Sequence, residues 1–356
     1  MQTQTPTSAE HRRIPAVLFE VCERCNLDCA YCYSVHKRPG GVPAARGSYG
    51  AARAVLERLF EIADVGRVTF SGGEPFLADG FEDHVRFCRE RGKGVLVTSN
   101  GNGGGEEEYA RLVALGVETF VFPFHSVDPA AHDSLTGVPG SHAKAAASLS
   151  AVRALGGIAV PIIVLTRLNA DGLESTLLEL KARGFRRIIV NRVNAGGRAI
   201  SEAGRIALGV GELRAAFAVA EDVAEKCGLW ITSNICTPHC VLDPRDYPRI
   251  GFGACDVDLE NRPVTVDTAG DVRFCNHSPI VMGNIFKDEL GAIFSSEYAR
   301  RWRETVPEEC AGCGRFRECV GGCRAASEQL GFDMSRVDPI AWGLTGAAAG
   351  DAPSLS

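Results

Sequence analysis

Two groups of closely spaced cysteines are the residues of this sequence best suited to metal chemistry. The first group comprises Cys22, Cys25, Cys29 and Cys32. Its two CxxC pairs would suit zinc knuckles, but zinc sites usually place about a dozen or more residues between such pairs so that the knuckles converge. Alternatively, the last three cysteines form a Cx3CxxC motif, in which three thiolates hold a [4Fe–4S] cube and leave the fourth iron without a protein ligand. Such an iron is open to a substrate or a cofactor.

The second group lies near the C-terminus, where Cys310, Cys313, Cys319 and Cys323 have the spacing CxxCx5Cx3C. By spacing alone this group would also suit zinc, because CxxC pairs are common in zinc sites. The chain has 14 cysteines in 356 residues, which is too few for a small scaffold held together by disulfides. Its polar residues 1–13 do not resemble a signal peptide. We therefore predict a cytoplasmic protein whose clustered thiols bind metal.

Alternating apolar runs and helical segments must position the first group. The predicted strands cover residues 16–21, 67–70, 94–98, 119–122, 158–165 and 187–191. The predicted helices, with apolar residues three and four apart, cover residues 49–63, 81–91, 106–115, 141–155 and 173–183. Repeated β-then-α units indicate a parallel sheet with helices outside it. About six units are too few for the eight of a closed barrel, so we predict an α/β fold with a partial (βα)6 TIM-like barrel.

The active sites of such sheets lie at the carboxyl ends of the strands. Residues 22–32, 71–75, 99–101 and 126–128 follow the first four predicted strands. We therefore expect these four segments to meet at one edge of the sheet.

The residue composition and the periodicity of the chain change after a predicted helix over 211–227 and a short predicted strand over 229–232. Beyond them Pro, Gly, Asp and Cys become frequent and helical periodicity fades, so we place a domain boundary near Ser233. The predicted organisation is a flexible tail at 1–13, the partial barrel at 14–232, a smaller irregular Cys-rich domain at 233–340 and a disordered tail at 341–356.

Composition excludes several classes of function. With 45% hydrophobic residues and a net charge of −6, the chain has enough apolar surface to fold as a globular protein of about two domains. Its pI near 5.8, without blocks of Lys or Arg, argues against a nucleic-acid partner. No apolar run approaches the ~18 residues that span a bilayer, so we expect no membrane partner.

The first cysteine motif, with Tyr31 before its last cysteine and a (βα)6-like pattern around it, resembles that of the radical S-adenosylmethionine (SAM) enzymes. Residues 71–75, Ser-Gly-Gly-Glu-Pro, resemble the GGEP motif of that family. The resemblance implies that Cys25, Cys29 and Cys32 hold the [4Fe–4S] cluster to which SAM binds. It implies that SAM contacts Gly72, Gly73, Glu74, Pro75, Ser99, Asn100 and Ser126. The Glu74 carboxylate would accept a hydrogen bond from the methionyl ammonium.

Three neighbouring features need their own interpretation. Residues 132–133, His-Asp, match family positions near the ribose and carboxylate of SAM, but many relatives carry an arginine shortly afterwards. This chain has Leu-Thr-Gly at residues 135–137 instead, and Arg167 is a candidate substitute for that arginine. We interpret His125 as a hydrogen-bonded structural residue rather than an acid or base.

The C-terminal cysteines resemble the SPASM extension of radical SAM enzymes, which holds auxiliary iron–sulfur clusters. Cys255, Gly270 and Cys275 precede the CxxCx5Cx3C run, so six of the seven cysteines of that pattern are present. By analogy, the first auxiliary cluster would use Cys255, Cys275 and Cys323 with Cys240, or alternatively Cys236, as its upstream ligand. The second cluster would use Cys310, Cys313 and Cys319.

The usual fourth ligand of the second auxiliary cluster follows an Asp-Pro, but here Asp338-Pro339 precedes Ile340 and no cysteine follows Cys323. That cluster is therefore predicted to have an open iron, to use an oxygen ligand such as Asp333 or Asp338, or to be lost. One of Cys236 and Cys240 could then serve as a hydrogen-atom donor. These motifs together imply one or two auxiliary [4Fe–4S] clusters besides the SAM-binding one.

The resemblance implies an enzyme that reduces SAM to a 5′-deoxyadenosyl radical, which abstracts a hydrogen from the substrate. We predict a peptide substrate in natural-product biosynthesis; the alternative is dehydrogenation, epimerisation or decarboxylation of a small sugar, nucleoside or aminocyclitol. A non-catalytic electron-transfer or zinc protein would leave the GGEP-like motif without a purpose. An external donor resembling flavodoxin or ferredoxin would supply electrons. A separate leader-peptide-binding protein would be needed, because few residues precede the first strand.

Overall fold

The computed structural model describes residues 12–37 and 47–342. Its centre is one curved sheet of eleven strands, in the order β10-β9-β8-β7-β6-β5-β4-β2-β11-β12-β13. The strands of this sheet are β2 (Val17–Cys22), β4 (Arg67–Gly72), β5 (Gly94–Thr98), β6 (Thr119–Pro123), β7 (Ala159–Leu165), β8 (Arg187–Arg192), β9 (Trp230–Ser233), β10 (Ile250–Phe252), β11 (Val264–Asp267), β12 (Asp271–Arg273) and β13 (Val281–Asn284). Neighbours from β10 to β11 pair in parallel, whereas β11, β12 and β13 pair antiparallel. A separate two-stranded sheet joins β1 (Arg12–Ile14) to β3 (Ala63–Val65) in parallel.

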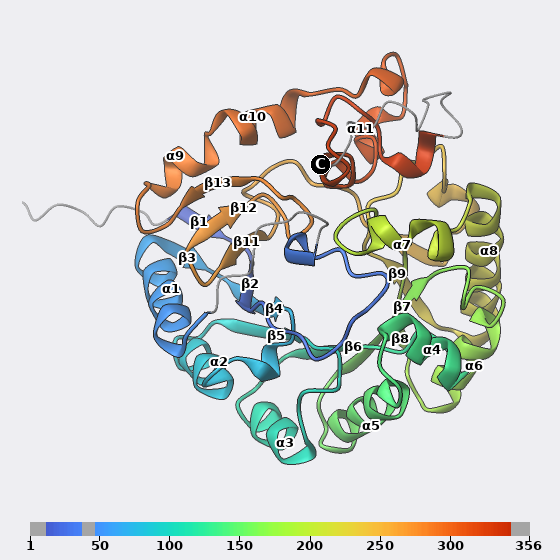
Figure 1. The fold of residues 1–356 in the computed structure, drawn as a ribbon, viewed down its shortest axis with the longest axis horizontal. Coiled ribbons are helices and arrows are strands. Elements are labelled where there is room, and N and C mark those ends of the chain that lie inside the picture. The colour runs from blue at the N-terminus through green and yellow to red at the C-terminus, as the bar shows by residue number, and fades with distance from the viewer. Residues whose placement is uncertain (1–11, 38–46, 343–356) are drawn as a thin grey trace, which may run out of the picture.

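Helices alternate with the parallel strands, as a (βα) barrel requires. They are α1 (Tyr49–Ile62), α2 (Phe81–Glu90), α3 (Glu106–Ala114), α4 (Pro129–Thr136), α5 (Ser141–Ala154), α6 (Leu173–Ala182), α7 (Ala199–Ile206) and α8 (Val210–Cys227). Figure 1 shows α1, α2, α3, α5, α6 and α8 along the outer side of the sheet. The later helices are α9 (Leu290–Phe294), α10 (Glu297–Glu304), α11 (Phe316–Cys319) and α12 (Arg324–Gln329). Figure 1 places α9, α10 and α11 across the opening between the β13 end and the β9 end of the sheet.

Apolar side chains of the strands form the core between the sheet and these helices. Phe19 of β2 and Phe70 of β4 are fully buried, with ring centroids 6.0 Å apart in an edge-to-face arrangement. Phe120 and Phe122 of β6 pack against the ring of Tyr109 from α3. Burying large aromatic side chains fixes the strands against their helices and so fixes where each strand ends. The loops at those carboxyl ends carry the cysteines and their neighbours.

The predicted fold class, a partial (βα)6 barrel followed by an irregular Cys-rich region, is confirmed. The six predicted strands correspond to β2 and β4 to β8, all in parallel register. The sheet continues past Ser233, because β10 pairs with β9 and β11 pairs with β2. The domain boundary there stays a prediction, and the predicted tails at 1–13 and 341–356 lie largely outside the described residues.

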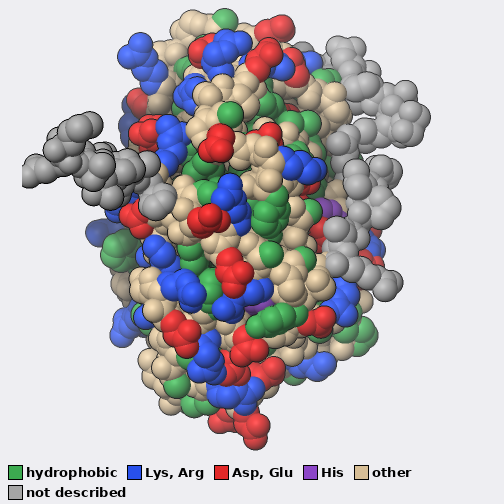
Figure 2. All heavy atoms as spheres, turned by 90° about the vertical axis from the view of Figure 1, so that its left-hand side faces the viewer, with side chains coloured by type: hydrophobic (Ala, Val, Ile, Leu, Met, Phe, Trp, Pro, Cys, Tyr) green, Lys and Arg blue, Asp and Glu red, His purple; other side chains and the backbone are tan. Residues whose placement is uncertain are grey.

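Basic and acidic side chains are interspersed over the face shown in Figure 2. That face therefore offers no broad field of one sign. Among the described residues, no helix has the length and apolar character needed to cross a bilayer.

Candidate functional site

The cysteine loop, residues 23–37, leaves the carboxyl end of β2 and is held by the end of α4. The N–H groups of Asp28 and Ala30 donate to the carbonyls of Thr136 and Leu135 over 3.0 and 2.9 Å. Gly137 follows with φ of 74°, and a Cβ there would lie 2.6 Å from the Asp28 carbonyl oxygen. Residues 135–137, where many relatives were expected to carry an arginine, therefore position this loop.

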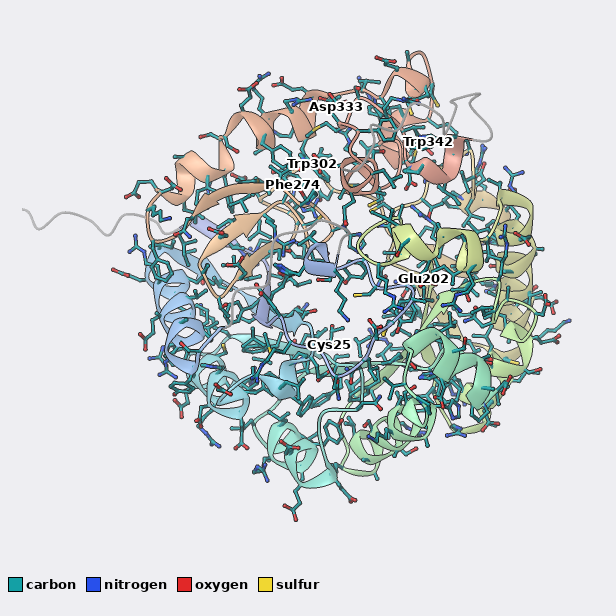
Figure 3. The ribbon with its side chains drawn as sticks, in the orientation of Figure 1. Cys25, Glu202, Phe274, Trp302, Asp333 and Trp342 are labelled. Atoms are coloured by element: carbon teal, nitrogen blue, oxygen red, sulfur yellow. The ribbon has the colours of Figure 1, made fainter. Side chains whose placement is uncertain are left out.

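The three predicted cluster thiols of this loop lie close enough to influence one another's ionisation. Burial raises the pKa of Cys29 to about 12, and the neighbouring Cys32 and Cys25 thiols act in the same direction. Burial also raises the pKa of Cys32. Figure 3 shows Cys25 towards the middle of the ring of strands and helices. Thiols that resist ionisation to this degree lose their protons when a metal binds the thiolates.

The spacing of the thiols fits iron–sulfur clusters better than zinc. A tetrahedral zinc ion holds each sulfur about 2.3 Å away, so its ligands crowd around one point. Within residues 12–37 and 47–342, no three His, Cys, Asp or Glu side chains come close enough to share one ion. In a [4Fe–4S] cube each thiolate binds a different iron, so the ligands stand further apart. Cys25, Cys29 and Cys32 are thus suited to hold a cube.

The two glycines of residues 72–73 bring the end of β4 against the start of the cysteine loop. Gly72 has φ of 125°, and a Cβ on either glycine would overlap the backbone of Cys22 or of Glu23 and Arg24. The Gly73 N–H donates to the Cys22 carbonyl over 2.5 Å. The glycines are therefore needed for contact between two protein segments, and not only for the expected approach to a ligand.

Glu74 is completely buried beside this contact and accepts several hydrogen bonds. Its Oε1 accepts from Ser99 Oγ over 2.8 Å, and its Oε2 accepts from the Asn100 N–H over 2.7 Å. Burial nevertheless raises the pKa of Glu74 to about 7. Because each carboxylate oxygen has two lone pairs, Oε2 can accept one more donor, and a cationic donor would favour the ionised form. Pro75 is buried and begins a short 3-10 helix, residues 75–77, directly after Glu74.

Asn100 connects the Glu74 network to the cysteine loop. Its Nδ2 lies 3.6 Å from Cys25 Sγ and 2.7 Å from Asn26 Oδ1, while its N–H binds Glu74. Ser126, in the loop after β6, is buried, and its Oγ accepts from the Asp128 N–H over 3.1 Å. The structure thus joins Glu74, Ser99 and Asn100 into one network at the cysteine loop.

A second hydrogen-bond chain reaches the same loop from β6 and β7. The Val164 N–H donates to His125 Nδ1 over 3.2 Å, so the ring proton lies on Nε2. That Nε2 is 2.6 Å from the Tyr31 hydroxyl, to which it donates, and the hydroxyl in turn hydrogen-bonds the Cys29 thiol. Burial lowers the pKa of His125 well below its usual value and keeps the ring neutral. This geometry agrees with the structural interpretation of His125.

The remaining features predicted near SAM have other partners. The Asp133 carboxylate accepts from the N–H groups of Gly140 and His142 over 2.6 and 2.8 Å and so fixes the start of α5. The buried His132 Nδ1 accepts from the His125 N–H over 3.1 Å. Arg167 donates to the Gly204 carbonyl and lies 3.6 Å from Glu212. Arg167 is thus engaged by α7 and α8 and is a poor substitute for the expected arginine.

Four cysteines from three segments form the first C-terminal group. The Cys236 thiol donates a hydrogen bond to Cys255, which lowers the pKa of Cys255 to about 6. Cys236 also lies within electrostatic range of Cys323 and Cys275. Arg262 Nη1 approaches Cys255 Sγ at 3.8 Å. Of the two upstream cysteines considered for this group, the structure brings Cys236 to it.

Cys240 lies instead with the other three C-terminal cysteines. Burial raises the pKa of Cys310 to about 12, with further contributions from Cys319, Cys240 and Cys313. Burial likewise raises the pKa of Cys240, and the nearby Cys319 and Cys313 thiols act in the same direction. The chain therefore forms two groups of four thiols, rather than one of four and one of three.

Two polar residues at the carboxyl end of β8, one at its last position and one just after it, were missed by sequence reasoning. Asn194 Nδ2 lies 3.2 Å from Cys323 Sγ, and Arg192 donates to the Cys236 carbonyl over 2.9 Å. Both side chains are buried. Their position at the carboxyl end of a predicted parallel strand could have marked them as site residues, because the other site residues lie at the same edge of the sheet.

Comparisons with known proteins agree with this arrangement. The family model described as the radical SAM superfamily matches residues 19–180, and that described as an iron–sulfur cluster-binding domain, SPASM, matches residues 255–314. The chain is 28% identical over 334 residues to the PqqA peptide cyclase of Xanthomonas campestris pv. campestris (strain 8004), covering 91% of this chain and 86% of that protein. It is 25% identical over 342 residues to the PqqA peptide cyclase of Ruegeria pomeroyi, covering 91% and 86%.

Solved structures share the fold. Streptococcus suis SuiB bound to the precursor peptide SuiA has a TM-score of 0.72 at 15% identity, covering 92% of this chain and 76% of that chain. Native anSMEcpe with bound AdoMet has a TM-score of 0.66 at 17% identity, covering 88% and 91%. These similarities support the partial barrel followed by the Cys-rich region.

Proposed function

Because this chain belongs to the radical SAM superfamily and carries a SPASM iron–sulfur domain, we propose that it modifies a peptide in natural-product biosynthesis. The predicted family and enzyme class are confirmed, and the cofactors of such an enzyme are SAM, a [4Fe–4S] cluster that binds SAM and auxiliary iron–sulfur clusters. When bound, the first cluster supplies the electron that cleaves SAM, and the resulting 5′-deoxyadenosyl radical abstracts the substrate hydrogen.

One observation carries the SAM-binding part of the proposal. Asn100 contacts Cys25 on one side and Glu74 on the other, at 3.6 and 2.7 Å. One residue therefore joins a cluster thiol to the carboxylate suited to an ammonium, through its side-chain amide on Cys25 and its backbone N–H on Glu74. In the proposal, Cys25, Cys29 and Cys32 hold the cluster and Glu74 receives the amino group of SAM.

The surrounding residues orient these groups and exclude water. Ser99 and the Asn100 N–H hold the Glu74 carboxylate in one orientation. Glu74, Ser99 and Ser126 are all buried, so a ligand at this edge exchanges water for fixed polar groups. Gly72 and Gly73 keep the two segments in contact.

The peptide substrate is supported by the named relatives. The two curated relatives described above are PqqA peptide cyclases, and SuiB was solved with a precursor peptide. We further propose an external donor resembling flavodoxin or ferredoxin and a separate leader-peptide-binding protein. A cytoplasmic location would keep the 14 cysteines reduced and available for iron.

The test uses the full chain, purified and reconstituted without oxygen. SAM, a strong reductant and the peptide encoded beside the gene are supplied, and 5′-deoxyadenosine and peptide mass are measured. We expect 5′-deoxyadenosine to form and the peptide to change in a SAM-dependent way. Absence of 5′-deoxyadenosine would contradict the enzyme class. An unchanged peptide, with turnover of a sugar or nucleoside instead, would contradict the peptide substrate.

A further inference from the structure

The second auxiliary group has a fourth thiol that the family pattern does not supply. That pattern provides Cys310, Cys313 and Cys319, and no cysteine follows Cys323. The structure packs the segment around Cys240 against residues 315–322, through Pro238 on Gly322 and through Arg315 on Asp243, which brings Cys240 within electrostatic range of all three thiols. We propose that Cys240 completes the second auxiliary cluster and Cys236 completes the first, an inference that rests on the auxiliary clusters of the proposed function. The predicted place of Cys240 in the first cluster is thereby revised.

Two short segments with the same spacing connect the two groups. Residues 236–240 read Cys-Thr-Pro-His-Cys and residues 319–323 read Cys-Val-Gly-Gly-Cys. The first segment gives Cys236 to the Cys255 group and Cys240 to the Cys310 group. The second gives Cys323 to the Cys255 group and Cys319 to the Cys310 group, so it runs between the two groups in the opposite direction. Each segment therefore contributes one thiol to each cluster.

A buried ion pair holds these two segments together at the first group. Arg192 donates to the Cys236 carbonyl over 2.9 Å and to Thr237 Oγ1 over 3.0 Å. It also forms a buried ion pair with Asp338, whose Oδ2 accepts from the Cys323 N–H over 2.8 Å. One end of the pair thus binds residues 236–237 and the other binds residue 323. Because the pair is buried and hydrogen-bonded on both sides, it fixes the separation of the segments.

A second set of contacts holds the segments together near the second group. Gly322 has φ of 82°, and a Cβ there would lie 2.5 Å from Pro238 Cδ, so the proline ring packs directly on this glycine. Arg315, which lies between Cys313 and Cys319, forms an ion pair with Asp243 and lies 3.0 Å from His239 Nδ1. These contacts fall on both sides of Cys240. Its position beside the other three thiols is therefore set by packing from two directions.

The oxygen ligands considered from the sequence are already engaged. Asp338 uses Oδ2 for Arg192 and the Cys323 N–H, and its Oδ1 accepts from the Ile340 N–H over 3.1 Å. Asp333 lies 3.1 Å from Arg301 of α10, and its Oδ1 accepts from the Ser335 N–H over 2.9 Å. Figure 3 shows Asp333 at the outer part of the C-terminal segment, away from the middle of the molecule. Cys240 is the better ligand, because thiolate is the usual ligand of such clusters.

This assignment determines whether the auxiliary clusters can bind a substrate or only transfer electrons. With four protein thiolates each, neither has an iron open to a substrate. Both would then serve to pass electrons, and the two shared segments provide short covalent paths between them. Cys236 and Cys240 are likewise removed as hydrogen-atom donors, because a thiolate bound to iron carries no proton to release.

The test counts iron in a background without the SAM-binding cluster. The variant Cys25→Ala/Cys29→Ala/Cys32→Ala should hold about eight irons per chain, four for each auxiliary [4Fe–4S] cluster. Adding Cys240→Ala should remove between about one and four irons and alter one of the two reduced EPR signals. Adding Cys236→Ala, in place of Cys240→Ala, to the same triple variant should alter the other of the two EPR signals. An unchanged iron count and spectrum for Cys240→Ala would overturn the proposal.

Matched variants separate ligand loss from general damage. Cys227→Ala, at the end of α8, and Asp333→Asn should each leave about eight irons and both signals unchanged. A drop in iron for Asp333→Asn would show an oxygen ligand and overturn the proposal. If Cys240→Ala fails to fold, Cys240→Ser keeps the side-chain size and should change the same EPR signal. SAM cleavage by the wild-type holoenzyme is assayed separately, so failure of the proposed function would not alter these iron counts.

Discussion

The SAM-cluster site and the auxiliary sites are built in opposite ways. Cys25, Cys29 and Cys32 lie on one loop, and their spacing within that loop defines the site. The auxiliary groups combine residues 236–240, 255–275 and 310–323, which meet only in the folded chain. In the proposed assignment, the first arrangement would leave one iron without a protein ligand, whereas the second would give every iron a thiolate.

This difference assigns distinct roles to the two regions. A loop with three thiols is a receptor for a ligand, and the Glu74 network beside it supplies polar contacts. Two groups of four thiols, joined by residues 236–240 and 319–323, are suited to storing and passing electrons. Substitutions in one region should therefore leave the iron of the other region unchanged.

Cys29→Ala should have the largest effect. Removing one of three thiolates should abolish SAM cleavage, a loss of at least roughly a thousandfold, because no protein ligand is left to replace it. The auxiliary iron should remain at about eight per chain. Iron analysis and a 5′-deoxyadenosine assay measure both, with Cys227→Ala as the control. Retained cleavage would contradict the assignment of this site.

Glu74→Gln should weaken SAM binding about 10- to 100-fold, because a charge-assisted hydrogen bond contributes ~1.5–3 kcal/mol. Burial raises the pKa of Glu74 to about 7, so the wild type should bind SAM more tightly as pH rises through 7, and the variant should lose this dependence. Titration calorimetry from pH 6 to pH 8, roughly one unit either side of that pKa, measures both. An identical pH profile in the variant would rule out Glu74 as the group responsible.

The same shift has the opposite sign for the stability of the ligand-free protein. Because the pKa is raised from 4.5 to about 7, the folded state binds the proton more tightly than the unfolded state. The Glu74 contribution to the free energy of unfolding is therefore complete below pH 4.5 and is lost as pH rises through about 7. Because Gln resembles the protonated acid, thermal unfolding of the wild type and Glu74→Gln should agree below pH 4.5 and diverge as pH rises through about 7, with the wild type becoming the less stable. A constant difference across this window would contradict the assignment to Glu74.

Gly137→Ala tests how far the cysteine loop depends on α4. Both Gly137 and Gly140 have positive φ, 74° and 81°, so alanine at either costs about 1–2 kcal/mol. A Cβ at residue 137 would also meet the Asp28 carbonyl at 2.6 Å, whereas one at residue 140 meets nothing within 4 Å. We expect Gly137→Ala alone to lower iron at the SAM cluster. Equal iron loss in both variants would argue that backbone strain, not loop contact, is responsible.

Tyr31→Phe should have the smallest effect. It removes the hydroxyl that links His125 to Cys29. Losing a donor to a thiolate should lower the midpoint potential of the SAM cluster by roughly 50 mV, close to the 59 mV of a tenfold change for one electron. Potentiometric EPR measures the shift, and His125→Phe should give a smaller one in the same direction. A shift in the auxiliary clusters instead would contradict this contact.

Local motifs could be predicted from sequence because their function needs adjacent residues. The Cx3CxxC loop, residues 71–75 and the parallel strands all follow from spacing and periodicity within short windows. The assignment of Cys240 did not follow, because it depends on contacts of Arg192 and Arg315 between segments far apart in the chain. The repeated Cx3C spacing of residues 236–240 and 319–323 was a signal, but it does not say which group each thiol joins.

Other features failed to be predicted for a similar reason. Asp133 was expected near SAM because residues 132–133 match family positions; in the structure its carboxylate fixes the first turn of α5. The continuation of the sheet into β10 and β11 was also missed, since these short strands depend on β9 and β2 as partners. Residue type alone does not show which of several available hydrogen bonds a buried group makes.

Mössbauer spectroscopy of protein reconstituted with ⁵⁷Fe, with and without SAM, tests the contrast between the two regions most directly. Under the proposed assignment, the SAM cluster has one iron without a protein thiolate and the auxiliary clusters have none, so SAM should change the signal of one iron in about twelve. Cys29→Ala should abolish that change. A change at two or more irons, or one that persists in Cys29→Ala, would show an open iron in an auxiliary cluster and contradict the account.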